Sequence, residues 1–249
     1  MRQKPLKAKT LDLTMTSLNG ALYATLGYMT FLGLFAPVVG VVRFWPGVFV
    51  PAVFAVLFGP IVGGVGASIG IFISDMLVHG NALLSLTVGV PANFVMFSLI
   101  GLLANRKSKP AWRYISTLVS LSILLFLLGL SYFLPWEGGE TFVWLGVAAI
   151  STAAILILSL AWPRWSGYQV AASVGNAVGS TIVGFGVWAF SQFLIVPGGG
   201  QNLSVISAYV LTVFTFMNQI PFLLIVVPPV LKASYRAFPA LVRRVQEEG

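Results

Sequence analysis

The residues of this chain that could carry out chemistry are few and are separated along the sequence. There is one histidine, His79, no cysteine, and six acidic residues, of which only Asp75 lies inside a long apolar stretch. If a helix continues through this stretch, Asp75 and His79 share one face because they are four residues apart. Three interpretations stay open: a solvated histidine at an interface, a histidine paired with Asp75, or a ligand contact at an outer mouth.

Several classes of chemistry are disfavoured by what the sequence lacks. Without cysteine there are no disulfides, thiolate zinc sites or iron–sulfur clusters, and one histidine cannot build a multi-histidine metal site. No serine is paired in sequence with a plausible buried base, and no glycine-rich loop ends in Gly-Lys-Ser or Gly-Lys-Thr. A single intramembrane carboxylate also argues against self-contained proton coupling. The sequence therefore predicts a protein that is not an enzyme and holds no metal or cofactor.

The composition indicates that lipid is the solvent of these apolar stretches. Of the 249 residues, 58% are hydrophobic and 8% are charged, whereas soluble domains carry roughly a quarter charged residues. The mean hydropathy of +0.95 agrees. The net charge of +8 does not indicate nucleic-acid binding, because the basic residues form short clusters beside apolar segments, as topology determinants do. We expect an all-α integral membrane protein that forms one transmembrane domain over residues 1–249.

Eight apolar segments are candidates for transmembrane helices, which need about 20 apolar residues each. The second is short and is bracketed by prolines, so it is either kinked or does not cross the whole bilayer. The first is too long for a cleavable signal peptide and is expected to be retained. The segments are Leu13–Leu34, Phe44–Phe58, Ile61–Val78, Leu84–Ala104, Tyr114–Leu134, Thr141–Trp162, Tyr168–Val196 and Leu203–Leu231.

The basic residues predict the orientation of these segments. With the N-terminus inside and eight alternating spans, 13 of the 14 lysine and arginine residues fall on the inner side, and only Arg43 falls outside. The positive-inside bias makes the opposite orientation improbable. We therefore expect a multi-pass protein of the cell (cytoplasmic) membrane with both termini in the cytoplasm.

Uncharged polar residues in the later segments are candidates for binding a small molecule. They could equally cross-link helices inside the bundle, because amides and hydroxyls do both in membrane proteins. The binding alternative is a cavity with amide, hydroxyl and aromatic walls for a small heterocycle, with Phe44, Trp45 and Trp188 as stacking residues. Arg43 either extends to the headgroups, pairs with Asp75 or binds an anionic substrate group. The candidate substrate-binding residues are Arg43, Phe44, Trp45, Asn93, Trp188, Ser191, Gln192, Ser204 and Thr212.

Pairs of small residues predict where helices approach closely. Such pairs occur in the third segment at Gly66 and Gly70, and in the seventh at Gly175 and Gly179. The first segment holds two overlapping pairs, one from Gly20 to Ala24 and the other from Ser17 to Ala21. In the first segment, internal packing and docking of a partner subunit both remain open.

The motifs around the second and third segments carry a family resemblance. The chain has the small-residue pattern near Ala21 and Ala24, an apolar segment with an internal Pro51, a Phe58-Gly59-Pro60 turn, and a glycine-rich helix that ends near Asp75. In this combination it resembles S-components of energy-coupling factor (ECF) transporters, the membrane subunits that capture vitamins. The end of the chain, from Asn218-Gln219-Ile220-Pro221 through Lys232, looks like the last helix of that family.

The resemblance implies a six-helix core, and the eight expected helices then include an extra hairpin. Residues 12–104 would form the first four helices, 112–162 the inserted hairpin, 167–232 the last two core helices and 233–249 a cytoplasmic tail. The implied function is capture of a small vitamin-like or heterocyclic compound from outside, in a pocket closed by the loop at residues 35–43. Gly20, Ala21 and Ala24 would dock onto an ECF coupling transmembrane subunit, which two separate ATPase subunits power. An Ala24→Trp change is then expected to block docking.

Two other functions fit the same sequence. A non-catalytic accessory subunit of another membrane complex would also need small-residue seams and no chemistry of its own. A stand-alone facilitator would need a polar path through the bundle. Neither of these two functions predicts ATPase partners. The three hypotheses are therefore distinguished by which proteins copurify with the chain, by whether it binds a ligand, and by whether uptake needs the coupling proteins.

Overall fold

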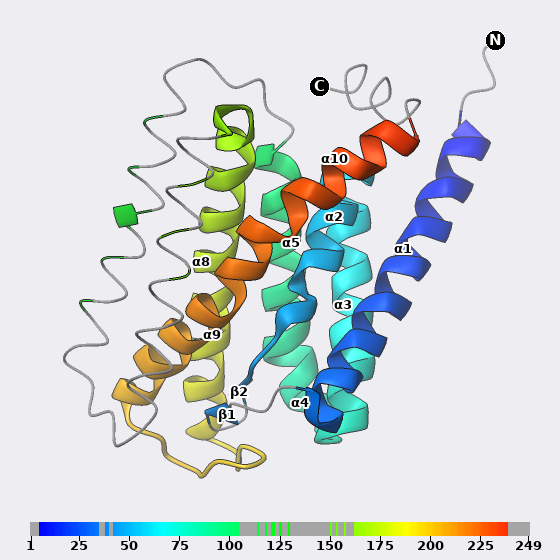
Figure 1. The fold of residues 1–249 in the computed structure, drawn as a ribbon. Helices are drawn as coiled ribbons and strands as arrows, with labels where there is room; N and C mark the ends of the chain where they lie inside the picture. Colours follow the sequence, from blue (N-terminus) through cyan, green and yellow to red (C-terminus); the bar gives the residue numbers. More distant parts are fainter. Residues whose placement is uncertain are drawn as a thin grey trace.

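The computed structural model describes residues 5–34, 38–39, 42–104 and 162–238, together with nine isolated positions between 114 and 157. The expected hairpin at 112–162 and most of the expected tail at 233–249 therefore lie outside the described residues. The described helices pack side by side as a bundle, with α9 and α10 crossing its face obliquely (Figure 1). A two-residue antiparallel ladder, in which Val38 pairs with Arg43 and Val39 with Val42, is the described exception to an all-helical chain.

The described elements run from α1 near the N-terminus to α10, with residues 105–162 between α5 and η4. In chain order they are α1 (Pro5–Met29), the π-helical turn η1 (Thr30–Leu34), β1 (Val38–Val39), β2 (Val42–Arg43), the 3-10 turn η2 (Pro46–Val48), α2 (Phe49–Phe58), α3 (Pro60–Val78), α4 (Ala82–Leu84), the π-helical turn η3 (Ser85–Gly89), α5 (Val90–Ala104), the 3-10 turn η4 (Pro163–Trp165), α8 (Ser166–Ser191), α9 (Val205–Ile225) and α10 (Val227–Ala237).

Four described helical segments are long and apolar enough to cross a membrane: Pro60–Val78, Ala82–Ala104, Ser166–Ser191 and Val205–Ala237. Their outward faces carry large apolar side chains, as on α3, where Ile61 is 63% and Leu77 is 56% exposed. Exposed apolar rows of this kind are costly in water and suited to lipid. The helical class is confirmed, and the apolar helices support a membrane-embedded protein.

These four segments correspond to the third, fourth, seventh and eighth predicted spans, with boundaries that differ by a few residues. The second predicted span is the short apolar helix Pro46–Phe58, which at 1.5 Å per residue is about 20 Å long and does not match a 30 Å hydrocarbon core. The first predicted span, Leu13–Leu34, is helical throughout, but it is not one of the four segments that are long and apolar enough to cross a membrane. The predicted count of eight spans is therefore not supported by the described residues.

The turn between α2 and α3 follows directly from its three residues. Gly59 has φ of +98°, in the region that favours glycine. Pro60 then starts α3 at a position where its missing N–H costs nothing. The Gly59 N–H donates to the Ala55 carbonyl at 3.1 Å and closes α2. The chain therefore reverses within one residue, and α2 packs against α3.

The contact between α1 and α3 is the most extensive between helices in the bundle. It depends on Gly66 and Gly70, where a Cβ would meet the side chain of Asn19 and, at 2.8 Å, the carbonyl of Gly20. Asn19 is fully buried, and its Nδ2 donates to the carbonyls of Val62 (3.0 Å) and Gly63 (3.2 Å). A buried amide that bonds a neighbouring backbone is a strong cross-link in lipid.

The segment that follows β2 enters the bundle in extended conformation before α2 begins (Figure 1). Non-helical backbone at this depth needs partners inside the protein. Asn218 of α9 supplies them, because its Oδ1 accepts from the Trp45 N–H at 3.2 Å and its Nδ2 donates to the Arg43 carbonyl at 3.5 Å. This contact fixes Arg43 and Trp45 against α9.

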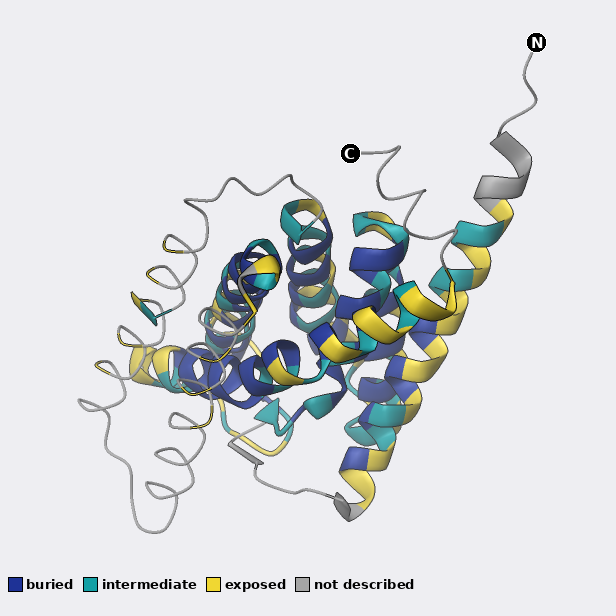
Figure 2. Ribbon diagram, turned by 45° about the horizontal axis from the view of Figure 1, so that its top comes forward, coloured by how far each residue is buried: buried dark blue, intermediate teal, exposed yellow. Residues whose placement is uncertain are grey.

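The second half of the described core is built where α8 packs on α5 and α9. Polar residues of α8 are buried there, and two of them bond to α9. Asn176 Nδ2 donates to the Phe216 carbonyl at 3.0 Å, and the Tyr168 hydroxyl donates to the Leu223 carbonyl at 2.8 Å. The buried residues lie along the interior of the bundle, whereas one side of α1 is exposed from residue 10 onward (Figure 2).

Candidate ligand-binding site

One cavity of about 100 Å³ lies among α1, β2, α3, η3, α5, α8 and α9, near the end of the bundle that carries β1, β2 and α4. Its apolar lining includes Ile71, Val88, Val183 and Val187. Its polar lining is drawn from five elements and from the residue that follows α3. These residues are Tyr23, Arg43, Asp75, His79, Asn93, Thr215 and Gln219.

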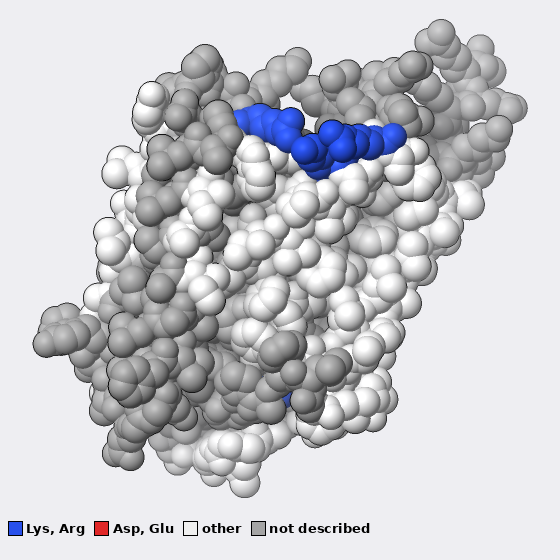
Figure 3. All heavy atoms as spheres, viewed as in Figure 1, with Lys and Arg blue, Asp and Glu red and all other residues white. Residues whose placement is uncertain are grey.

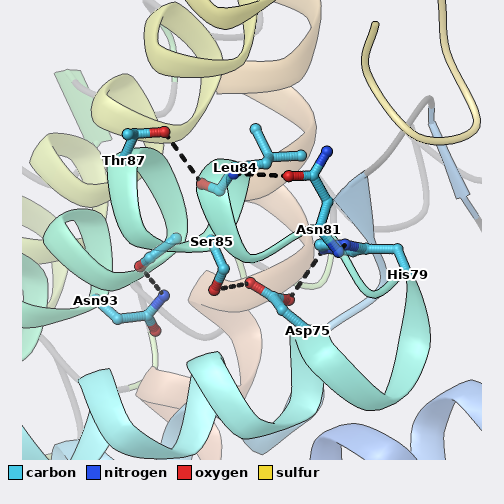
Figure 4. A network of polar contacts seen from close by, with 8 residues as sticks. Asp75, His79, Asn81, Leu84, Ser85, Thr87 and Asn93 are labelled. Carbon is cyan, nitrogen blue, oxygen red and sulfur yellow. Dashed lines mark hydrogen bonds and ion pairs between the residues drawn. The ribbon is translucent and has the colours of Figure 1, made fainter. Parts of the chain in front are cut away.

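Asp75 is the carboxylate of this cavity and is held from two sides (Figure 4). The Ser85 hydroxyl donates to its Oδ2 at 2.7 Å, and His79 Nε2 lies 3.6 Å from its Oδ1. His79 Nδ1 accepts the backbone N–H of Asn81 at 3.1 Å, so the ring proton belongs on Nε2, toward Asp75. The expected shared face of Asp75 and His79 is therefore present.

Space for this carboxylate depends on Gly89 in the turn η3. A Cβ at Gly89 would lie 2.9 Å from Asp75 Oδ2, which is closer than such contacts normally come. The π-helical geometry of η3 brings Ser85 and Gly89 to the same side of Asp75, where one donates and the other leaves room. Asp75 is 8% exposed, so its few contacts dominate its electrostatics.

A chain of hydrogen bonds forms the inner wall of the cavity. Trp45 Nε1 donates to the Tyr23 hydroxyl at 2.7 Å, which donates to Asn93 Oδ1 at 2.8 Å. Asn93 Nδ2 then donates to the Gly89 carbonyl at 2.9 Å. The rings of Tyr23 and Trp45 also meet edge to face, with centroids 5.9 Å apart. These polar groups are mutually satisfied, so the wall is stiff and its shape is set without a ligand.

Two other polar groups of the cavity lack such partners. Arg43 Nη1 and Gln219 Oε1 are both buried and accept or donate no hydrogen bond within the described part of the chain. The guanidinium of Arg43 stacks near Phe31 and Trp45, at 5.4 and 5.7 Å from the ring centroids. Burial lowers the pKa of Arg43 from its ordinary value, and the negative charge of Asp75 opposes this shift.

Arg43 and Asp75 face the same cavity but do not pair directly. Within the described segments, the carboxylate forms no ion pair with Arg43 at 4.0 Å or less. The two charges are close enough to influence one another, as the effect of Asp75 on the Arg43 pKa indicates. The cavity therefore presents a cation and an anion separated by open space.

The structure brings three of the predicted substrate-binding residues to this cavity: Arg43, Trp45 and Asn93. Phe44 does not line it. Its ring packs on Phe222 with centroids 5.4 Å apart, on the other side of the extended segment. Adjacent residues point to opposite sides in extended backbone, so only alternate residues of this segment reach the cavity.

The other five predicted binding residues lie at the connection and seam between α8 and α9. Ser191 Oγ donates to the Trp188 carbonyl and accepts from the Leu203 N–H, and Gln192 Nε2 donates to the Leu203 carbonyl at 3.0 Å. Thr212 Oγ1 donates to the Ala208 carbonyl at 2.8 Å and packs against a glycine of α8. Ser204 is exposed at the start of α9. Trp188 packs its ring on Phe185. Ser191, Gln192 and Thr212 therefore take part in the α8–α9 junction and do not line the cavity.

The residues predicted to dock a partner point in two directions. Gly20 and Ala24 are buried, and a Cβ on Gly20 would lie 3.2 Å from the Gly66 carbonyl of α3. Ala21 is exposed. A tryptophan at Ala24, which is 6% exposed, would therefore disturb the bundle itself. Of the three predicted docking residues, Ala21 alone is free to meet a partner at this surface.

Several residues of the cavity were not predicted from the sequence to belong to the binding site. Tyr23 joins Trp45 to Asn93 in the cavity wall, yet a tyrosine in an apolar helix gives no signal of such a role. Gln219 was visible on the polar face of the eighth segment, but no pattern separates an amide without a partner from a bonded one. Asp75 was visible as the one embedded acid. Its signal was the burial of a charge, which proteins retain mainly at functional sites.

No protein-family model, curated protein or solved structure matches the chain. The described residues also contain no group of three histidine, cysteine or acidic side chains that could hold a metal ion. Fold and site together define a class: a membrane-embedded helical bundle with a polar cavity whose Arg43 and Asp75 are not paired with each other. A more particular assignment depends on the cavity and the sequence resemblance alone.

Proposed function

We propose that this chain is the substrate-capturing membrane subunit of an ECF-type importer, which binds a small compound from outside the cell. One observation carries the proposal. An apolar bundle keeps a cavity in which Arg43 Nη1 and Gln219 Oε1 are buried and have no hydrogen-bond partner among the described residues. Leaving buried polar atoms unpaired costs about 1–3 kcal/mol each, and a ligand that bonds them recovers this cost.

The charge distribution supports an outward-facing cavity. Lys232 and Arg236 lie on α10, at the end of the bundle opposite to β2, which carries Arg43 (Figure 1). Figure 3 shows a basic surface patch at the α10 end. By the positive-inside bias the basic end faces the cytoplasm. The cavity then opens toward the outside, and both termini lie in the cytoplasm of a cell-membrane protein.

The residues that follow β1 support capture. Val42, Arg43 and Trp45 line one side of the cavity, and Asn218 attaches this segment to α9. The guanidinium of Arg43 lies near the rings of Phe31 and Trp45. Binding groups that are held in place before the ligand arrives lose little conformational freedom when it binds.

The proposal extends to parts of the chain that the structure leaves undescribed. It takes residues 12–104 and 167–232 as a six-helix S-component core, 112–162 as an inserted two-helix hairpin and 233–249 as a cytoplasmic tail. The partners are a coupling transmembrane subunit, which meets the exposed face of α1 around Ala21, and two ATPase subunits. The Phe58-Gly59-Pro60 turn and Asp75 are the residues of the resemblance that the described fold uses for its α2–α3 reversal and its cavity.

Purification of the tagged chain from its native membranes tests this function. We expect it to carry one membrane partner and two ATPases, and Ala21→Trp to reduce their recovery while the bound ligand stays. Ala189→Trp, an exposed alanine on α8, is the matched control and should retain both. A stable complex without ATPases would instead identify an accessory subunit. Substrate uptake in cells that lack the coupling proteins would identify a facilitator.

A further inference from the structure

The opposite charges of the cavity are not paired with each other. Arg43 lies on β2 and Asp75 near the end of α3, and within the described residues they line the same space with no ion pair between them at 4.0 Å or less. We infer that the ligand is a compact zwitterion, with a carboxylate or similar anionic group at Arg43 and an ammonium or similar cationic group at Asp75. This inference rests on the proposed function and names its substrate class.

Arg43 is positioned to receive an anionic oxygen. Its guanidinium lies between the rings of Phe31 and Trp45, which hold it through cation–π contacts. Its backbone carbonyl accepts from Asn218, so the residue is fixed at both ends. Nη1 is buried without a partner. A guanidinium bonds a carboxylate through two parallel N–H groups, more strongly and with more directional preference than a neutral donor would.

Asp75 is positioned to receive a cationic or N–H-rich group. Its Oδ2 accepts one bond from Ser85, and its nearest other donor is His79 Nε2 at 3.6 Å, beyond hydrogen-bond distance. An ionised carboxylate accepts about four hydrogen bonds, so acceptor capacity is left over. Gln219 Oε1 adds a neutral acceptor to the lining of the same cavity. The cavity therefore offers acceptor capacity to a cationic or N–H-rich group.

Charge balance selects a zwitterion over a singly charged ligand. A purely anionic ligand would pair Arg43 and leave the Asp75 carboxylate with only the Ser85 hydroxyl and the His79 ring, 3.6 Å away, beside it. A purely cationic ligand would pair Asp75 and leave Arg43 without an anion. An uncompensated buried charge is strongly unfavourable. A molecule that carries both charges satisfies both residues and is neutral overall. The cavity volume of about 100 Å³ favours an amino-acid-sized or single-ring compound over a larger one.

The test uses the purified full chain in lipid nanodiscs and three matched sets of probes. Each set holds a zwitterion, the acid without the amine and the amine without the acid: 4-aminobutyrate, butyrate and butylamine; alanine, propionate and ethylamine; phenylalanine, 3-phenylpropionate and phenethylamine. Binding is measured by equilibrium dialysis with mass-spectrometric detection. We expect at least one zwitterion to bind roughly 30-fold or more tightly than its acid and its amine.

The charge variants assign each end of the ligand. Arg43→Gln should lower the affinity of the zwitterion to that of its amine, and Asp75→Asn should lower it to that of its acid. Arg164→Gln, an exposed arginine at the opposite end, should change neither. Acids or amines that bind as tightly as the zwitterion, no zwitterion bound, or equal effects of Arg43→Gln and Arg164→Gln would overturn the inference.

A cavity-filling pair separates this inference from the proposed function. Val183→Phe fills the cavity lining, and Val178→Phe adds the same ring on the exposed face of the same helix. If a neutral or singly charged compound binds the wild type and Val178→Phe but not Val183→Phe, ligand capture stands and the zwitterion is wrong. If the wild type neither carries a ligand through purification nor binds any probe, both fail.

Discussion

The cavity and the α8–α9 junction contain the same kinds of polar residue and use them in opposite ways. At the junction, Asn176, Ser191 and Gln192 donate to backbone carbonyls within the chain. In the cavity, Arg43 Nη1 and Gln219 Oε1 are buried without partners. A polar group that is bonded internally stabilises the bundle, whereas one that is left unbonded lowers stability and is free for a ligand. Substitutions at the junction should therefore lower the stability and leave ligand binding unchanged. Substitutions of the unbonded cavity groups should lower ligand binding and leave the stability unchanged or higher.

The largest expected effect is at the junction, at Gly184. A Cβ there would meet the backbone of α9, at 2.7 Å from the Thr212 nitrogen, and backbone cannot move aside as a flexible side chain does. We expect Gly184→Ala to lower the free energy of unfolding by about 2–3 kcal/mol. The measurement is thermal or denaturant unfolding in one fixed detergent. Gly200→Ala, at a position with open space around it, should leave the free energy of unfolding unchanged. Equal effects of the two substitutions would contradict the close packing of α8 against α9 at Gly184.

The next effect is the loss of one junction amide. Asn176→Leu removes the donor to the Phe216 carbonyl and the acceptor of the Ser180 hydroxyl, which stands 3.3 Å away. We expect a loss of about 1–2 kcal/mol of unfolding free energy, with ligand occupancy of the folded protein unchanged. The exposed Gln201→Leu serves as the control. A drop in occupancy at unchanged stability would place Asn176 with the binding residues instead.

Within the cavity wall, Tyr23→Phe separates shape from chemistry. The change leaves Trp45 Nε1 without its acceptor and Asn93 Oδ1 without its donor. We expect a loss of about 1 kcal/mol or somewhat more in unfolding free energy. Ligand affinity should weaken with it, because the wall positions Trp45 beneath Arg43. Both expectations are checked by measuring unfolding and ligand occupancy on the same samples. An unchanged unfolding midpoint would show that these hydrogen bonds do not contribute to stability.

The smallest and most discriminating change is Gln219→Leu. Because Oε1 has no partner, an apolar side chain of similar size should leave the unfolding free energy unchanged or raise it by about 0.5–1 kcal/mol. Ligand occupancy should fall at the same time. The combination of gained stability and lost occupancy is the signature of a binding residue. A loss of stability like that of Asn176→Leu would remove the contrast between the two regions.

Much of the fold could be predicted from the sequence because long apolar runs and the Phe58-Gly59-Pro60 turn depend on local chemistry. Segments 60–78, 82–104, 166–191 and 205–237 follow from hydropathy. The small-residue pairs of α1 were visible too, but not their directions. Gly20 and Ala21 are adjacent, and their roughly 100° separation around the helix puts one against α3 and the other outside.

The site was harder to predict, since it is defined by partners that the sequence does not reveal. Gln192 and Gln219 are both glutamines near helix faces, yet one bonds the Leu203 carbonyl and the other has an oxygen with no partner. Asn19 gave no periodic signal, although it cross-links α1 to α3. Arg43 and Asp75 stood out because a charge in an apolar segment is expensive. Their separation across a cavity required the structure.

The ligand carried by the intact protein tests the central claim most directly. Native mass spectrometry of the full chain, released from nanodiscs, measures the bound fraction for the wild type, Val183→Phe and Val178→Phe. We predict that the wild type and Val178→Phe carry the same small molecule and that Val183→Phe carries none, with unfolding midpoints alike for the two variants. Equal occupancy in Val183→Phe and the wild type would show that the cavity between Arg43 and Asp75 is not where this protein holds its ligand.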